Sequence, residues 1–497
     1  MAAIITEKFR QTNADAFFTD VGTSKYYMFI GKSQPWTSEG ATSDSNPPTP
    51  IDSVAPEAYY WDDMLGAKLI SSKSYVIPRR NYSTSVPFDM YRHDISSSAT
   101  TSSGASNLYD STFYFMTSQN RVYKVLYNGD DAQTGASNIT GSDPVSEVNE
   151  PFWHNQYYLK FMYKMSASDV QNFLTTDFMP VIVNDNNATS GGITAFLIPT
   201  VGSNYPTTGG EGGGNTFYTK VRGDGSGGVL KLVVNGGNIS RMAETGQSAV
   251  QTAGSGYTFA SLDLDKSNIF TDTGCTTPID ATTGNTWNNA TDATIQLMIE
   301  PAGGHGADDI EELGGHYVML QSKFQPADSD VVQVNDFRRI GIVKNPVDPQ
   351  TSQISVQSTA RTTNAIKLQA NAAFQVDEEI YQAGSYARGR VVEYDSTNYI
   401  LYYIQEGYAS YGLSTDASVK NNVVSFNNSG QITGATSNVN GTPNSGQNAA
   451  VNGVAFSAGL SVPELNRDSG DIIYVENRRP ISRASDQTED IKVVVEF

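Results

Sequence analysis

The sequence lacks most of the side chains on which catalysis and metal binding commonly depend. It has one cysteine, Cys275, and four histidines among 497 residues. A single cysteine excludes a disulfide within the chain and a zinc site built from several thiolates. The chain also contains no G-x-S-x-G, P-loop or H-E-x-x-H motif. We therefore expect no enzyme and no cofactor.

Positive charge and long apolar runs are scarce as well. The chain carries 32 Lys and Arg against 52 Asp and Glu, a formal charge of −20. Such a surface repels phosphate backbones, so nucleic acid is not an expected partner. No window approaches the roughly 20 apolar residues of a membrane helix, and the opening MAAIITEKFR does not resemble a signal peptide. We expect a soluble protein made in a reducing cytoplasm, without a membrane partner.

The sequence is rich in the residues of strands and turns. Glycine occurs 44 times and proline 20 times, while charged residues make up only 17% of the chain. This mixture favours short strands joined by many turns, and so a mainly β fold with a few short helices. Helices are predicted at 6–22, 61–69 and 166–175, and strands at 25–36 and 74–82.

Two details of these elements can be tested. The first helix would place Phe9, Ala16 and Phe17 on one face and end at Gly22. Pro78 would confine its strand to a sheet edge, because proline cannot donate to a ladder of hydrogen bonds.

Changes in composition divide the chain into five segments. The Gly-rich segment alternates turns and strands and is interpreted as an inserted β module, and the Asn/Ser/Gly-rich one as a long loop or flexible insert. The segments are an N-terminal core part with short helices (1–184), the Gly-rich β module (185–333), a core strand with a small antiparallel barrel or meander (334–412), the Asn/Ser/Gly-rich insert (413–460) and C-terminal core strands (461–497).

Three stretches bear a superficial likeness to functional motifs. Gly223, Gly225 and Gly228 fit G-x-G-x-x-G, but the residues after them predict a strand, whereas a dinucleotide site requires a helix there. The overlapping Arg-Gly-Asp is attributed to coincidence. The stretch from His305 to His316 is rich in acids, yet a short helix would separate its histidines by roughly 10 Å or more. We favour a capped turn over a weak cation site.

The third stretch, YYWDDM, places Asp62 and Asp63 beside aromatic residues that include Trp61. A sugar-binding or glycan-cleaving cleft would combine such groups, but catalytic carboxylates usually converge from separate elements. The first turn of a helix is the favoured interpretation.

Two arginine pairs stand out in this acidic chain. Arg79-Arg80 and Arg478-Arg479 each lie beside a proline next to an apolar run. Arginine forks hold carboxylates better than lysine does, so the pairs predict either exposed strand ends or a clamp within or between subunits.

Several segments resemble the baseplate wedge subunit family of T-even-like contractile-tailed phages, the gene-product-eight family. Trp36 and Arg338 lie in these segments and join the two arginine pairs as candidate interface residues. The segments are EKFR…FFTDVG…YYMFIGKSQPW, YVIPRRNY, YYLKFMYKMSASDVQNFLTTDFMPV, FRRIGIVKNP and GDIIYVENRRPISRASDQTEDIKVVVEF.

The resemblance implies a non-enzymatic virion protein with a layered antiparallel β-sandwich core from which loop domains emerge. It implies a homodimer that bridges other baseplate wedge subunits and takes part in rearrangement before sheath contraction. The expected location is the tail baseplate, after assembly in the host cytoplasm. The segments 185–333 and 413–460 have no counterpart and could decorate the surface, replace a neighbour or contact a tail fibre. The alternative is a carbohydrate-binding or glycan-cleaving tail protein.

The end of the chain predicts two strands, 471–477 and 491–497, joined by a turn over 478–490. Pro480 favours an extended Arg479 in that turn. Phe497 would then end inside a folded sheet.

Overall fold

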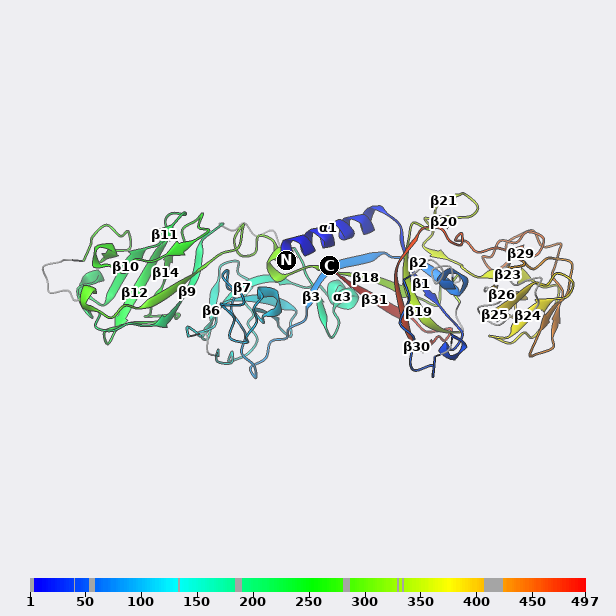
Figure 1. The fold of residues 1–497 in the computed structure, drawn as a ribbon, viewed down its shortest axis with the longest axis horizontal. Coiled ribbons are helices and arrows are strands. Elements are labelled where there is room, and N and C mark those ends of the chain that lie inside the picture. The colour runs from blue at the N-terminus through cyan, green and yellow to red at the C-terminus, as the bar shows by residue number, and fades with distance from the viewer. Residues whose placement is uncertain are drawn as a thin grey trace. The chain divides into compact units, whose positions relative to one another are not determined.

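The computed structural model describes residues 4–39, 41–52, 59–132, 135–183, 190–279, 287–328, 330–332, 335–405 and 423–497. The chain forms two compact units, each assembled from separate segments. Unit 1 comprises Met1–Asp15, Ser74–Met319 and Val495–Phe497, and unit 2 comprises Ala16–Lys73 and Leu320–Val494. Both consist mainly of antiparallel strands (Figure 1), which confirms the predicted mainly β fold.

Unit 1 contains a small four-stranded sheet and the strands of the Gly-rich segment. The first sheet has the order β4-β5-β7-β6, with β4 at Tyr114–Met116, β5 at Arg121–Tyr127, β6 at Phe152–His154 and β7 at Tyr157–Lys164. In the Gly-rich segment β13-β12-β10-β16 form a sheet with β14 against β12, and β9 pairs β17 and β11 pairs β15. Their bounds are β9 Ile193–Thr200, β10 Thr216–Lys220, β11 Arg222–Gly223, β12 Val229–Asn235, β13 Asn238–Ile239, β14 Ala249–Thr252, β15 Ala260–Ser261, β16 Ile269–Phe270 and β17 Thr294–Ile299.

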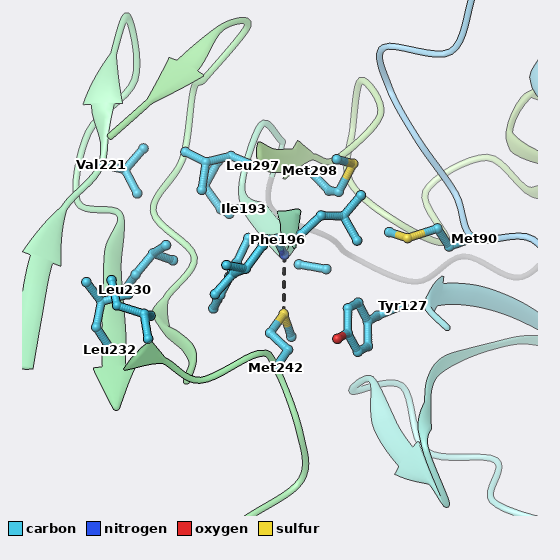
Figure 2. Packing of buried hydrophobic residues seen from close by; sticks show 14 of the residues in the cluster. Met90, Tyr127, Ile193, Phe196, Val221, Leu230, Leu232, Met242, Leu297 and Met298 are labelled. Carbon is cyan, nitrogen blue, oxygen red and sulfur yellow. Dashed lines mark hydrogen bonds between the residues drawn. The ribbon is translucent and has the colours of Figure 1, made fainter. Parts of the chain in front are cut away.

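A continuous hydrophobic core runs through these strands of unit 1 (Figure 2). Phe196 and Leu297, from the paired strands β9 and β17, pack in the same cluster as Tyr127 of β5 and Leu230 of β12. The backbone N–H of Phe196 donates to the sulfur of Met242 at 3.2 Å. The Gly-rich segment therefore shares its core with the first sheet.

Unit 2 is built around two larger sheets. One has the order β22-β2-β1-β19-β30 and the other β28-β27-β24-β25-β26-β23-β29, and β20 pairs β21. The bounds are β1 Tyr26–Gly31, β2 Met64–Leu69, β19 Asp336–Lys344, β20 Val347–Asp348, β21 Gln353–Ile354, β22 Thr359–Ala360, β23 Asn364–Lys367, β24 Glu379–Gln382, β25 Arg388–Asp395, β26 Ile400–Ile404, β27 Ile432–Gly434, β28 Asn440–Gly441, β29 Leu460–Ser461 and β30 Asp471–Ser482.

A further sheet has the order β31-β18-β3-β8. Its strands are β3 (Ser72–Pro78), β8 (Phe178–Pro180), β18 (Tyr317–Phe324) and β31 (Glu489–Glu496). Because β3 lies between β18 and β8, the prediction that Pro78 places its strand at an edge is wrong. Pro78 is the last residue of β3, where no further ladder bond is required of it.

The helices are short and mostly follow their sequence signals. Those described over their full length are α1 (Glu7–Thr23), α3 (Ala167–Phe173), α4 (Asp309–Leu313) and the 3-10 turns Trp36–Glu39, Leu108–Asp110, Glu211–Gly213, Lys266–Asn268 and Trp287–Asn289. Ser166 caps α3 through a reciprocal bond pair with Asp169. In α1 the predicted face is wrong, since Phe9 is 57% exposed whereas Gln11 and Ala14 are buried.

Two strand assignments also differ from the predictions. The segment 61–69 is helical only up to Asp62, and Met64–Leu69 forms β2 because it pairs with β1 along its length. Of the predicted flexible insert, residues 413–422 lie outside the described residues. The remainder, 423–460, contributes β27 and β28 and buries Phe426 and Ile432, so it is part of the seven-stranded sheet.

The chain ends in strand β31, as predicted, but the turn before it is shorter. Arg478, Arg479 and Pro480 belong to β30, and the turn covers only 483–488. Ile491 and Val493 of β31 are 8% and 3% exposed.

Deletion of residues 491–497 should destabilise the fold severely, because it removes two buried side chains and the pairing of β31 with β18. Thermal unfolding monitored by circular dichroism measures the effect. The control Glu496→Gln, at an exposed position, should change stability by less than about 0.5 kcal/mol. Cooperative unfolding of the truncated chain at the wild-type temperature would contradict the role assigned to β31.

Candidate functional site

Two adjacent arginines of β19 are buried against carboxylates in unit 2. The Arg338 side chain is 5% exposed and donates to both oxygens of Asp44 at 2.9–3.0 Å. Arg339 is 3% exposed and pairs with the equally buried Asp63. The Arg339 guanidinium also lies 4.5 Å from the ring centroid of Tyr60 and 5.4 Å from that of Trp36. The two arginines thus tie the segments before β2 to the centre of the sheet.

The other candidates of unit 2 surround this arginine cluster. Trp36 is fully buried, and its indole N–H donates to the carbonyl of Arg478 at 2.7 Å. The side chain of Arg478 is 46% exposed and pairs with Glu476 on the same strand. Arg479 is exposed and donates to the carbonyl of Ser45 at 3.1 Å. The backbone of β30 is therefore anchored here, whereas both of its arginine side chains reach the surface.

Arg79 and Arg80 lie in unit 1, just after β3. Arg79 donates to the carbonyl of Thr175 at 2.7 Å. Arg80 stacks over the buried ring of Tyr114 at 4.4 Å and donates to the carbonyl of Tyr109 at 3.1 Å. Both arginines hold loops of their own unit to the end of the strand.

The sequence interpretation did not single out Asp44 and Arg339, and it assigned Asp63 to a helix turn. The doublet Arg338-Arg339 inside an apolar strand was the available signal, because buried arginines require acidic partners. Asp44 lies in a Ser/Thr-rich stretch where nothing distinguishes it from exposed acids.

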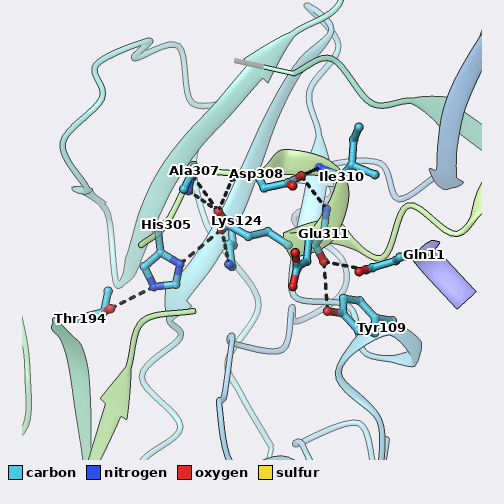
Figure 3. A network of polar contacts seen from close by, with 11 residues as sticks. Gln11, Tyr109, Lys124, Thr194, His305, Ala307, Asp308, Ile310 and Glu311 are labelled. Carbon is cyan, nitrogen blue, oxygen red and sulfur yellow. Dashed lines mark hydrogen bonds and ion pairs between the residues drawn. The ribbon is translucent and has the colours of Figure 1, made fainter. Parts of the chain in front are cut away.

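A second buried ion pair lies in unit 1, in the stretch from His305 to His316. Asp308 caps α4 and Gly314 ends it in the left-handed region, as the capped-turn interpretation predicted. The ammonium of Lys124, on β5, lies 2.7 Å from Glu312, and both side chains are almost fully buried. His305 completes the group, 3.0 Å from the hydroxyl of Thr194 (Figure 3).

The charges of this group are fixed by their neighbours. Burial opposes ionisation of Glu312, but Lys124, His305 and the N–H groups of Gly306 and Ala307 outweigh it, so the pKa of Glu312 falls to about 2. Burial, with Lys124 nearby, lowers the pKa of His305 to about 4, and the imidazole is neutral at pH 7.

The second histidine of the stretch has a different partner. His316 pairs with Glu7 of α1. Over the described residues, no three His, Cys, Asp or Glu side chains are placed to hold a metal ion directly.

In the stretch YYWDDM the tryptophan and both acids are buried and are not presented to a ligand at the surface. Trp61 is 6% exposed and packs in the core of unit 2. Asp62 pairs with Arg467 at 2.6 Å, whereas Asp63 pairs with Arg339. The two carboxylates thus serve separate partners, and the indole face is covered by protein.

A strand, β12, follows the glycine motif, as predicted. Gly223 ends β11, and Gly228 precedes β12. The carboxylate of Asp224 accepts bonds from the backbone N–H groups of Thr258 and Phe259 at 2.9 and 3.2 Å. The acid of the Arg-Gly-Asp sequence therefore stabilises a turn of its own unit.

Replacement of Lys124 by methionine should cost about 3–5 kcal/mol, because it leaves the buried carboxylate of Glu312 without its cation. The matched control is Lys8→Met, since Lys8 pairs with the neighbouring Glu311 but both side chains are largely exposed. That variant should lose less than about 1 kcal/mol. Urea denaturation measures the free energy of unfolding of both variants. Equal losses would show that burial of the ion pair does not determine the cost of removing its cation.

Asp62 should make stability depend on pH in a defined direction. Burial raises its pKa from 3.8 to about 6, although Arg467 opposes the change. The folded chain thus binds this proton more tightly than the unfolded chain, and the resulting stability is complete below about pH 4 and lost as the pH rises through about 6.

Asp62→Asn removes this dependence. Its free energy of unfolding relative to the wild type should rise by up to about 3 kcal/mol between about pH 4 and pH 7. Urea denaturation at both pH values checks this. A constant difference between the two proteins would contradict the raised pKa.

No helix among the described residues is long and apolar enough to cross a membrane. Residues 3–150 match the family model described as Bacteriophage T4, Gp8. Baseplate wedge protein gp8 of Enterobacteria phage T4 is 29% identical over 147 residues, which make up 28% of this chain and 42% of the relative. The resemblance to the phage baseplate wedge family is thereby confirmed, on a match that extends over residues 3–150.

Proposed function

We propose that this protein is a structural subunit of a phage tail baseplate wedge, acting through protein–protein contacts and not through catalysis. The observation that carries the proposal is the Gp8 family match over residues 3–150. That match includes β1 and β2, in the five-stranded sheet of unit 2, and β4 and β5, in the four-stranded sheet of unit 1. The match with the curated relative spans less than half of that protein's length. The partners and the assembly of this chain are therefore proposed here.

The way the chain uses its charged side chains supports a structural role. Arg338, Arg339 and Lys124 are buried and engaged by acids of their own unit. Such pairs contribute little net stability compared with apolar packing, but they fix which segments meet. A subunit that must present constant surfaces to several neighbours benefits from that specificity.

We propose further that the protein is a homodimer within the wedge and bridges other wedge subunits. Assembly in the host cytoplasm precedes incorporation into the virion, and rearrangement precedes sheath contraction. Of the six candidate interface residues, Arg478 and Arg479 are the best placed for contacts between subunits, since their side chains are exposed at the edge strand β30. The segments 185–333 and 413–460 are proposed to contact peripheral baseplate or fibre proteins.

The purified chain should sediment as a dimer, and Arg478→Glu with Arg479→Glu should weaken the dimer or its incorporation into wedges while the fold is kept. Reversal introduces repulsion at an exposed surface and leaves the anchoring backbone bond from Trp36 to Arg478 intact. Analytical ultracentrifugation and wedge reconstitution measure the two effects. The double glutamine variant is the matched control for loss of charge alone. A monomer at high concentration, or reversal without effect on dimer and wedge, would contradict the proposal.

A further inference from the structure

Strand β30 forms an edge of the five-stranded sheet in unit 2. With 12 residues it is the longest strand that the structure describes, and it pairs with β19 but with no second described strand. Over 472–477, the backbone groups directed away from β19 have no hydrogen-bond partner among the described residues. An edge of this kind is a template on which another strand can pair.

The outer side of this edge is open and partly apolar. Ile473, within the strand, is 44% exposed. Proteins usually protect such edges with proline or with charged side chains. In β30 the proline and the two exposed arginines come after residue 477, so the stretch 472–475 lacks this protection. The same stretch lines a groove of about 380 Å³ together with Pro50, Ile51, Asp52 and Tyr60.

The charges of β30 make the strand complementary to a second copy of itself. Asp471 is exposed at its start and Arg479 toward its end, and neither has an ion-pair partner among the described residues. When two copies of a strand pair in antiparallel orientation about a two-fold axis, the start of each lies opposite the end of the other. With the axis at Val475, Asp471 of each copy lies opposite Arg479 of the other. The exposed Ile473 then lies opposite Asn477.

The same operation does not suit β31, another strand with one described partner, β18. An axis at Val493 would place Asp490 opposite Glu496, and an axis at Lys492 would place the two lysines opposite each other. Like charges directly opposite destabilise a strand pair. The charge pattern therefore favours β30 over β31 as the strand that pairs with its own copy.

We propose that β30 of a second copy pairs with this edge, antiparallel and with the two-fold axis at Val475. The two five-stranded sheets then form one continuous sheet, in which main-chain hydrogen bonds supply affinity and the ion pairs fix the register. The contact is self-complementary, as a two-fold interface requires. The inference rests on the homodimer proposed above and assigns to it a strand and a register.

Cysteine cross-linking in the full chain tests the register. Directly opposite residues of antiparallel strands have Cα atoms about 4.5–5.5 Å apart, within the range of a disulfide. Val475→Cys should therefore give a disulfide-linked dimer on mild oxidation, seen on a non-reducing denaturing gel. Cys275 is buried, so the wild type should give none under the same conditions.

Ile473→Cys is the matched control, because it is the more exposed position on the same strand. In the proposed register its two copies are offset by four residues, about 14 Å, which is too far for a disulfide. Random collisions would link Ile473→Cys at least as fast as Val475→Cys. We expect Val475→Cys to be linked at least about tenfold faster, because only its two copies lie within reach of each other.

An exchange of charges tests the ion pair without cysteine and serves if Val475→Cys does not fold. Asp471→Arg and Arg479→Asp alone should each weaken the dimer about tenfold, since each places like charges opposite each other at two points. The double variant restores opposite charges and should recover the dimer. Analytical ultracentrifugation measures the dissociation constants.

Two results separate this inference from the proposed function. The β30 contact would be overturned, and the wedge proposal left intact, by a dimer in which Val475→Cys is linked no faster than Ile473→Cys and the double variant is as weak as the single ones. A chain that enters wedges as a monomer would overturn the contact and the homodimer together, but not the role in the baseplate.

Discussion

The pairing of Arg339 with Asp63 is the interaction on which the central sheet of unit 2 depends. Asp63 stands immediately before β2, and its carbonyl accepts the N–H of Lys32 just after β1. Arg339 lies in β19 and reaches Asn477 of β30 at 3.0 Å. One ion pair thus links the end of β1 and the start of β2 to β19 and β30, and the aromatic rings of Tyr60 and Trp36 cover it. Removal of either partner would leave a buried charge, which costs far more than the pair contributes.

Unit 1 also contains a buried ion pair, which is formed by Lys124 and Glu312. Glu312 holds Lys124 on one side and the backbone of 306–307 on the other, so the loop before α4 is drawn onto β5. A chain with only 32 basic residues thus commits several of them to its interior. Each of them pairs with an acid, so the net charge of the surface is not changed, but fewer positive groups remain exposed. Arg478 and Arg479 remain exposed, and in such an acidic chain they offer a partner one of few positively charged surfaces.

The sequence predicted the elements whose signals are local. Ser166 and Asp169 specify the start of α3, and Asp308 and Gly314 specify both ends of α4, because capping depends on residues within one turn. Misassigned elements depend on distant residues. Met64–Leu69 has the composition of a short helix but pairs with β1, and Asn/Ser-rich segments around Ile432 become strands only because β24 accepts them. Tertiary pairing overrides local preference in both cases.

The same distinction applies to the candidate sites. Arginine doublets could be recognised as unusual, but nothing in the sequence pairs Arg338 with Asp44 across 294 residues. Contacts of such long sequence separation are set by topology and not by local pattern.

The assembly of unit 1 from separate segments has a consequence for folding. Its last segment is Val495–Phe497, and the N–H of Phe497 donates to the carbonyl of His316 at 3.2 Å. The segment Leu320–Val494 of unit 2 lies between this piece and the rest of unit 1 in the sequence. Closing so long a stretch of chain costs entropy before the contact forms, so this part of unit 1 should be completed late in folding.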